Sequence, residues 1–233
     1  MEGSRAAGTD GLYEIRRIES RSSERRITGC EADIMQKYDL VLEPDLPAVD
    51  YPLPELPEGE NLWIFGYGSL MWRPGFDHLG IEDAQLYGYH RAFCVTSVVH
   101  RGTPEMPGLV LGLDRGGSCR GKGILCPADI RAPVIDYLYR REMVTRVYRP
   151  KMVRIRLLKT GAMASALTFV ADPTHDQYCG KPAEEEAARI IARARGRGGP
   201  NVEYLQSTLE HLDEFGIADG PLHRIMDRIK SGA

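Results

Sequence analysis

The segment "WIFGYGSLMW", residues 63–72, begins as an apolar strand and then places a tyrosine between two glycines. Glycines at the end of a strand give the backbone conformational freedom and let a ligand approach closely. Successive N–H groups in such a loop can bind an anion or a polarised carbonyl. In the alternative interpretation, Gly66 and Gly68 only relieve steric crowding in a tight turn. The local sequence leaves both interpretations open.

Three familiar glycine motifs do not match this segment. A dinucleotide-binding G-x-G-x-x-G would need a third glycine where Met71 stands. A phosphate-binding P-loop would need a Gly-Lys-Ser/Thr ending, which is absent. A nucleophile elbow needs G-x-S-x-G, whereas Ser69 directly follows Gly68. The motif therefore does not indicate nucleotide binding or a nucleophilic serine.

A second candidate group is Glu142, in "PVIDYLYRREMV", residues 133–144. Ile135 and Leu138 define the apolar face of a predicted helix, and Glu142 falls on the same face. Burial raises the pKa of a carboxylate, which suits it to carry protons. The alternative is a surface ion pair with a nearby arginine, above all Arg146 at the i+4 position.

The elements that must position these groups follow from hydrophobic periodicity and turn residues. Short strands and few helices without regular β-α alternation predict an α+β fold. We expect strands over residues 62–67, 84–89, 92–99, 108–113, 121–126, 152–157 and 166–170. We expect helices over residues 133–142, from Pro182, from an N-cap at Asn201, and from Pro221.

Composition narrows the class of protein. The 233 residues carry a formal net charge of −3, which gives no basic field for nucleic acid or an anionic membrane. No apolar run approaches the roughly 18 residues of a membrane span, and no signal peptide is apparent. Five cysteines form no CxxC pair, so neither a zinc site nor a redox pair is indicated. We expect a cytoplasmic protein with reduced cysteines, and inert core thiols at Cys94 and Cys126.

The chain divides into two parts at about residue 60. Five prolines fall in residues 44–57, which predicts an extended connector preceded by polar sequence with one short helix over residues 31–40. We expect residues 1–60 to be an N-terminal extension and residues 61–230 to be the functional domain. The arginine-containing "RARGRGG", residues 193–199, lacks interleaved aromatics and is interpreted as a solvated loop rather than an RNA-binding segment.

Several motifs in order resemble the ChaC family of γ-glutamylcyclotransferases. They are "FGYGSLMWRPGF", "GYHRAFC", "RGTPEMPGLVLGLDRGGSCRG", "YLYRREM" and "GPNVEYL", which span residues 65–205. The resemblance implies a small mixed β-barrel with packed helices and a helical C-terminal part, and no cofactor or metal. It also implies a catalytic carboxylate at Glu142. The γ-glutamyl-binding loop is implied at Ile64, Phe65, Gly66, Tyr67, Gly68 and Ser69.

Members of that family cleave glutathione to 5-oxoproline and cysteinylglycine. The α-amine of the substrate attacks its own γ-carbonyl, so the enzyme needs a base, donors for the oxyanion and an acid for the leaving amine. Glu142 would act as base and then as acid. Ser69 would bind substrate and would not be a nucleophile. Tyr67 would wall the pocket or donate its hydroxyl.

Other positions stay open as parts of the site. The carboxylate at the glycine end of glutathione could meet any of four basic residues, each of which could equally be surface charge or packing: Arg73, His90, Arg91 and Arg101. His90 is placed in a turn between strands, where it could cap backbone. Tyr204 could line the pocket or be a core aromatic beside Leu205 and Leu209.

The predicted function is a glutathione-specific γ-glutamylcyclotransferase, with glutathione as the partner and the oligomeric state left open between monomer and dimer. One rival is the same chemistry on a γ-glutamyl amine or dipeptide. The other is a non-catalytic γ-glutamyl-binding module that regulates cation transport, because a shared fold does not guarantee activity.

Overall fold

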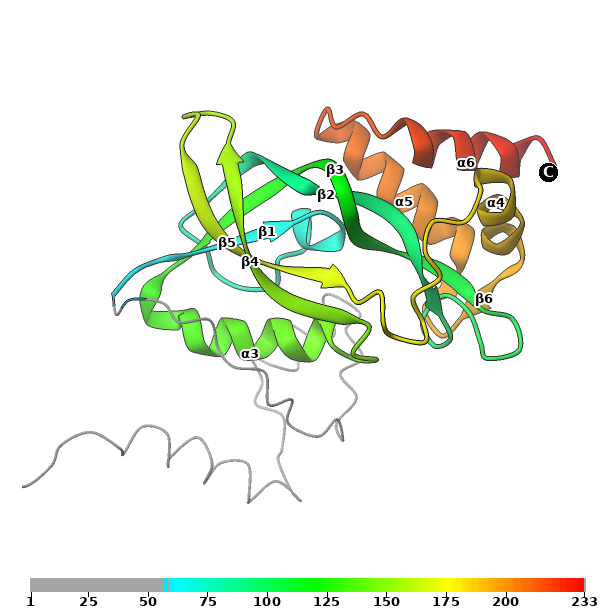
Figure 1. The fold of residues 1–233 in the computed structure, drawn as a ribbon, viewed down its shortest axis with the longest axis horizontal. Helices are drawn as coiled ribbons and strands as arrows, with labels where there is room; N and C mark the ends of the chain where they lie inside the picture. The colour runs from blue at the N-terminus through cyan, green and yellow to red at the C-terminus, as the bar shows by residue number, and fades with distance from the viewer. Residues whose placement is uncertain (1–56, 58, 233) are drawn as a thin grey trace, which may run out of the picture. The chain divides into compact units, whose positions relative to one another are not determined.

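The computed structural model describes residue 57 and residues 59–232. Five strands of this part close into a barrel in the order β1-β3-β2-β4-β5 (Figure 1). β1 and β5 pair in parallel and the other neighbours are antiparallel, which confirms the predicted α+β fold with a small mixed barrel. The strands are β1 (Leu62–Gly66), β2 (Gly80–Ser97), β3 (Gly108–Cys126), β4 (Tyr148–Leu157) and β5 (Met163–Ala171).

Both faces of β1 are buried, which explains its continuous apolar run. Phe65 points into the barrel interior, where it packs in a large apolar cluster with Leu86 and Leu113. Leu62 and Ile64 alternate with it and pack in a second cluster, against α3. Because β1 is held on two sides, its C-terminal end is a rigid point from which a loop can start.

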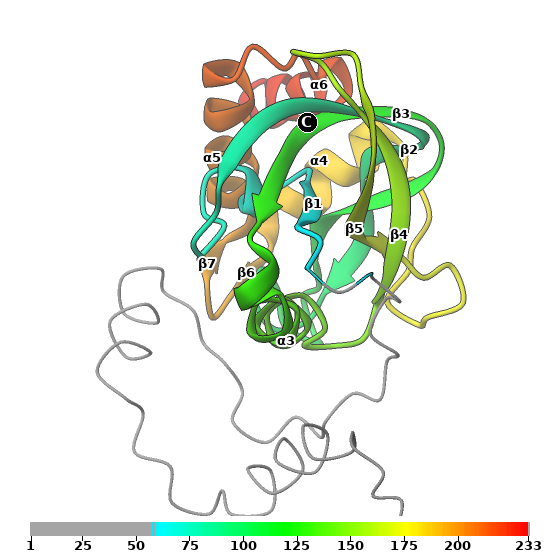
Figure 2. The same ribbon diagram turned by 90° about the vertical axis from the view of Figure 1, so that its left-hand side faces the viewer.

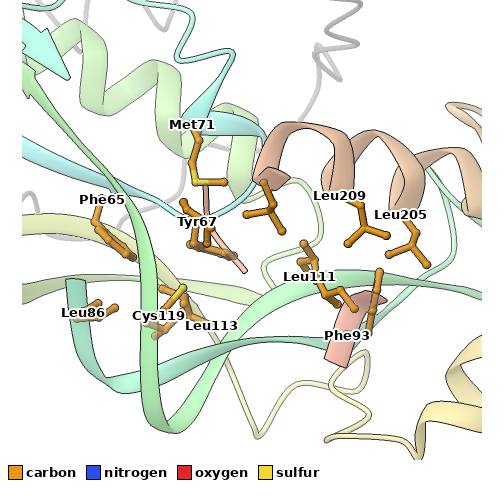
Figure 3. Close-up of a cluster of buried hydrophobic side chains, with 14 of the residues drawn as sticks. Phe65, Tyr67, Met71, Leu86, Phe93, Leu111, Leu113, Cys119, Leu205 and Leu209 are labelled. Atoms are coloured by element: carbon orange, nitrogen blue, oxygen red, sulfur yellow. The ribbon is translucent and has the colours of Figure 1, made fainter. Parts of the chain in front are cut away.

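The helices cover the barrel in two groups: α3 (Arg131–Glu142), and then α4 (Glu184–Arg193), α5 (Asn201–Glu214) and α6 (Gly220–Lys230). Figures 1 and 2 show α3 alone on one side of the barrel and the other three together on a different side. In Figure 3, Leu205 and Leu209 of α5 lie beside Leu111 and Phe93 of the barrel strands. The helical C-terminal part is therefore packed onto the barrel.

The structure corrects four local predictions. Residues 84–89 and 92–99 form the single strand β2, with an irregularity between Tyr87 and Tyr89, so His90 lies within a strand and not in a turn. Residues 108–113 and 121–126 likewise join in β3. Periodicity identified the apolar runs of each long strand but not the polar and glycine residues that join them. Asn201 does not cap α5, because its side chain bonds the N–H and C=O of Leu109 instead. α4 begins at Glu184, after Pro182.

Pro133 lies in the first turn of α3 and Pro221 in the first turn of α6, as expected. The "RARGRGG" segment contains β6 (Arg195–Gly196) and the start of β7 (Gly199–Pro200), and its arginines are exposed. The helix expected over residues 31–40 and the connector expected over residues 44–57 lie, except for Pro57, outside the described residues. Within the described residues, no helix is long and apolar enough to cross a membrane.

Candidate active site

The glycine loop begins where β1 ends and is held at two of its carbonyl groups. The buried Thr168 hydroxyl donates to the carbonyl of Phe65 at 2.9 Å. Arg91 Nε donates to the carbonyl of Tyr67 at 2.6 Å. The N–H groups of Tyr67, Gly68, Ser69 and Leu70 donate to no acceptor in the described residues. These four successive N–H groups are therefore free to bind an anion or an oxyanion.

The two glycines of the loop have different reasons to be glycine. A Cβ on Gly66 would lie 3.1 Å from Leu70 Cβ and 3.2 Å from Met71 N, which is tighter than ordinary contact. A Cβ on Gly68 would meet nothing within 4 Å. Gly66 therefore satisfies the steric interpretation. The space beside Gly68 is open, as the ligand-approach interpretation requires.

Glu142 is the last residue of α3, and one-fifth of its side-chain surface is exposed. The apolar face predicted for this helix is confirmed, since Ile135 and Leu138 are buried. Desolvation raises the pKa of the Glu142 carboxyl, and the charge of Arg141 together with its hydrogen bond opposes the rise. Arg141 Nε lies 3.1 Å from Glu142 Oε1. Arg146, the partner expected at i+4, is exposed beyond the helix end, with φ at 60°.

Three tyrosines from three segments lie close enough to Glu142 for its charge to affect their pKa values. Burial raises the pKa of Tyr67 and of Tyr148 well above the usual value, and the nearby charge of Glu142 adds to both shifts. Burial also raises the pKa of Tyr204 to about 12, again with a contribution from Glu142. All three hydroxyls are therefore protonated at neutral pH. Through Tyr67, the glycine loop therefore lies close to Glu142.

Tyr148 and Tyr204 are fixed by the same backbone unit. The Tyr148 hydroxyl donates to the carbonyl of Leu111 at 2.6 Å, and the N–H of Leu111 donates to Tyr204 Oη at 3.4 Å. Tyr204 also packs edge-on against Phe93, with ring centroids 6.2 Å apart. The Tyr204 ring therefore packs against the core, and the charge of Glu142 contributes to the raised pKa of its hydroxyl.

The basic residues considered for the substrate's far end are spread over different places. Arg91 is buried and its guanidinium is bonded by Tyr67, Arg120 and Asp219, so it is not surface charge. The guanidinium of Arg101 lies 5.6 Å from the centroid of the Tyr204 ring. His90 Nδ1 lies 3.1 Å from the carbonyl of Gly116. The N–H of Arg73 donates to the carbonyl of Ser69 at 2.8 Å, so Arg73, Arg91 and Arg101 each contact a residue of the candidate site, whereas His90 contacts Gly116.

Tyr148 was not identified from the sequence. The strand that carries it was expected to start at Met152, and β4 begins instead at Tyr148. Apolar-polar alternation is interrupted at Arg149 and Pro150, so periodicity did not extend the strand to the tyrosine. In the sequence, the only indication was that Tyr148 lies six residues after Glu142, the end of the predicted helix.

The remaining candidate groups are the cysteines and any cluster of potential metal ligands. Burial raises the pKa of Cys94 to about 12 and that of Cys126 to about 11, in keeping with their prediction as core thiols. Among the residues that the structure describes, no three or more His, Cys, Asp or Glu side chains are grouped so that they could hold a metal ion.

Comparison with known proteins identifies the family. A family model described as "ChaC-like protein" matches residues 62–231. The chain therefore belongs to the ChaC-like family. It is 34% identical over 174 residues to the glutathione-specific γ-glutamylcyclotransferase of Escherichia coli, which covers 75% of each chain.

Further relatives carry the same description. The human glutathione-specific γ-glutamylcyclotransferase 1 is 35% identical over 175 residues, which is 73% of this chain and 79% of the relative. A crystal structure of a γ-glutamyl cyclotransferase specific to glutathione from yeast superposes with a TM-score of 0.65 at 22% identity. That match covers 74% of this chain and 99% of the yeast chain. At that identity the likeness concerns the fold, and it agrees with the mixed barrel and its helices.

Proposed function

We propose that this protein is a γ-glutamylcyclotransferase that cleaves glutathione to 5-oxoproline and cysteinylglycine. The observation that carries the proposal is the meeting of two groups: a loop with free backbone N–H donors and a desolvated carboxylate at Glu142. The E. coli and human relatives, both named as glutathione-specific, support the choice of substrate.

In this proposal the loop residues 64–69 bind the γ-glutamyl group. Their N–H groups hold either its α-carboxylate or the oxyanion that develops on the γ-carbonyl oxygen. The open space beside Gly68 lets the substrate backbone come close. Holding the γ-glutamyl chain curled places the amine near the carbonyl, and effective molarities of oriented groups reach about 10⁵ M or more.

Glu142 is the proton carrier of the reaction. A free α-amine has a pKa of about 7.7–8.0, so near neutral pH the ammonium form must lose a proton before it attacks. Glu142 takes that proton as a base, and the amine nitrogen bonds to the γ-carbon. As the C–N bond of the tetrahedral intermediate breaks, Glu142 returns that proton to the departing cysteinyl nitrogen. Glu142 then takes the second proton of the attacking nitrogen, which leaves the amide of 5-oxoproline, and passes it to the released amine. A carboxyl group whose pKa is raised by desolvation is a better acid-base partner near neutral pH.

Tyr67, Tyr148 and Tyr204 complete the pocket as protonated donors. The Tyr204 hydroxyl accepts from Leu111, so its own proton points elsewhere in the pocket. Tyr67 Oη makes no hydrogen bond to a described residue and can donate to substrate. Neither hydroxyl competes for protons with Glu142, because burial keeps both pKa values high.

We also propose that residues 61–230 form the catalytic domain, that residues 1–60 are an extension outside it, and that the protein works in the cytoplasm. The family match over residues 62–231 supports the domain boundary. The proposed chemistry uses no cofactor.

The test is product formation by the purified full-length protein. Incubation with glutathione should release 5-oxoproline and cysteinylglycine in equal amounts, and γ-glutamyl-alanine should be a poor substrate. Preference for γ-glutamyl-alanine or a γ-glutamyl amine would contradict glutathione as the substrate but agree with the proposed cyclotransferase reaction. Glutathione binding in a calorimeter without any product would contradict the enzyme and favour a γ-glutamyl-binding module.

A further inference from the structure

The guanidinium of Arg141 lies between the two halves of the candidate site. On one side, its Nε is 3.1 Å from Glu142 Oε1. On the other side, its Nη2 donates to Ser69 Oγ at 2.8 Å. Its Nη1 donates to the carbonyl of Arg73 at 2.6 Å and to Tyr137 Oη at 3.0 Å. Only 9% of the Arg141 side chain is exposed, so the guanidinium is committed to these contacts.

We propose that Arg141 is a positioning residue that holds the Glu142 carboxylate and the Ser69 hydroxyl in one rigid frame, and thereby orients Ser69 as a donor to the substrate. This inference rests on the proposed function, since it assigns a role within the same site. Arg141 itself touches no reacting atom in this scheme and acts through its two neighbours.

The Ser69 half of the argument follows from hydrogen-bond directions. A hydroxyl has one proton to donate and two lone pairs to accept with. Because Arg141 is a pure donor, Ser69 Oγ must accept in this contact, and its proton is directed away from the guanidinium. A cationic donor also polarises the hydroxyl and strengthens its own donation. Ser69 then adds a side-chain donor to the free N–H groups of the loop.

The Glu142 half of the argument is electrostatic. The titratable groups that face Glu142 are Arg141 on its own helix, Tyr67 on the glycine loop, Tyr148 on β4 and Tyr204 on α5. The tyrosines are neutral at working pH, because burial raises their pKa values. Arg141 therefore supplies the positive charge that offsets desolvation of the carboxylate. Its removal should raise the Glu142 pKa further.

The neighbouring Arg140 provides a matched control. It lies one position earlier on α3 and carries the same charge, but 59% of its side chain is exposed and it pairs with Asp136 at 2.7 Å. Substitution of either arginine removes one positive charge from the same helix turn. Any effect specific to Arg141 must therefore come from its contacts.

The experiment compares Arg141→Gln, Arg141→Lys and Arg140→Gln in the full-length protein by pH-dependent kinetics. Arg141→Gln should move the acidic limb of kcat/KM to higher pH and raise KM about tenfold, as expected for one lost charge-assisted hydrogen bond. Arg141→Lys keeps the positive charge, so the acidic limb of its kcat/KM profile should stay at the pH of the wild type. Its KM should still rise. Arg140→Gln should match the wild type in both.

Ser69→Ala closes a double-mutant cycle with Arg141→Gln. If Arg141 acts through Ser69, the two KM effects should be less than additive. A purely structural role for Arg141 predicts a lower melting temperature with unchanged KM, unchanged pH limb and additive effects, and that result would overturn the proposal. If Arg141→Gln does not fold, Arg141→Lys carries the test, and a wild-type KM for it overturns the proposal.

A second measurement is independent of turnover. Carboxyl ¹³C NMR of glutamate-labelled protein, with the Glu142 signal assigned by its loss in Glu142→Gln, should show a higher Glu142 pKa in Arg141→Gln than in the wild type. An unchanged Glu142 pKa in Arg141→Gln would contradict the proposed role of Arg141, even if the enzyme is active. The Glu142 pKa could rise in Arg141→Gln while the wild type releases no 5-oxoproline. That result would refute the proposed function but support the pairing of Arg141 with Glu142.

Discussion

Two largely buried arginine-carboxylate pairs contact the glycine loop from different elements, and they resemble each other closely. Arg91 Nη1 lies 2.9 Å from Asp219 Oδ2, and Arg141 Nε lies 3.1 Å from Glu142 Oε1. Arg91 holds the loop at the carbonyl of Tyr67, and Arg141 holds it at the hydroxyl of Ser69. Distance, burial of the arginine and attachment to the loop are all similar.

The pairs differ in what their carboxylates leave unused. Asp219 Oδ2 binds Arg91, and its Oδ1 accepts from Leu222 N as the N-cap of α6. Glu142 Oε1 faces Arg141, while Oε2 accepts no hydrogen bond from the described residues. Both oxygens of Asp219 are therefore used within the fold, whereas under the proposed mechanism the free oxygen of Glu142 would serve the substrate. Burial and pairing with an arginine are therefore shared by Asp219 and Glu142, and only the second oxygen of each carboxylate sets the two apart.

The largest difference should appear in turnover. Glu142→Gln keeps the shape of the side chain but removes the proton carrier, so we expect 5-oxoproline release to fall about 10³-fold. Asp219→Asn should stay within a few-fold of the wild type. The distinction between the two pairs would be lost if both variants turned over at similar rates in a coupled 5-oxoproline assay.

In stability, unlike in turnover, substitution of Asp219 should have a larger effect than substitution of Glu142. Asp219→Ala leaves the Arg91 charge buried without its partner and removes the α6 cap, which should cost about 3–5 kcal/mol in the free energy of unfolding. Urea denaturation measures this cost. Glu142→Gln in the same titration should not be destabilised. Equal losses for both variants would mean that Glu142, too, is structural.

The two glycines sharpen the comparison within the loop. Gly66→Ala pushes a methyl group against Leu70 and Met71, which should cost about 1–3 kcal/mol of stability. Gly68→Ala meets no described atom, so its melting temperature should stay near that of the wild type. Its KM for glutathione should nevertheless rise about tenfold, the equivalent of about 1.4 kcal/mol, because the methyl group occupies the approach path. An unchanged KM for Gly68→Ala would contradict the ligand-approach interpretation of Gly68.

The smallest effect concerns the pH dependence of stability. The raised Glu142 pKa means that the folded state holds its proton above the pH at which the unfolded state has lost it. Stability of the wild type should therefore fall as pH rises through that window, from the ordinary glutamate pKa up to the raised folded value. Glu142→Gln lacks this slope and should be the more stable protein at neutral pH, with the difference vanishing in acid. Thermal melts across pH 4 to 8 measure the difference, and an increasing advantage of the wild type with pH would contradict the assigned shift.

Local elements were predictable where local chemistry decides them. The amphipathic face of α3, the strand before the glycine loop and the hairpin of β4 with β5 all follow from periodicity and turn residues. The position of Asn201 was not predictable in the same way. A residue well suited to an N-cap bonds Leu109 on β3 instead, because tertiary contacts override local capping preference.

The sequence by itself determined the two halves of the candidate site. It identified the glycine loop, it placed Glu142 on an otherwise apolar helix face, and its ordered motifs indicated the family. These conclusions depend on residues near each other along the chain, or on motifs in order.

Only the tertiary structure decided which arginine accompanies Glu142, and which tyrosines surround it. Spacing favoured Arg146, but α3 ends at Glu142 and the chain turns away before Arg146. Arg141, the adjacent residue, turns its guanidinium to the carboxylate because Ser69 and the carbonyl of Arg73 hold it there from another segment. The ion-pair partner of Glu142 depends on which segments, distant in the sequence, lie beside it. The closed barrel fixes the positions of those segments.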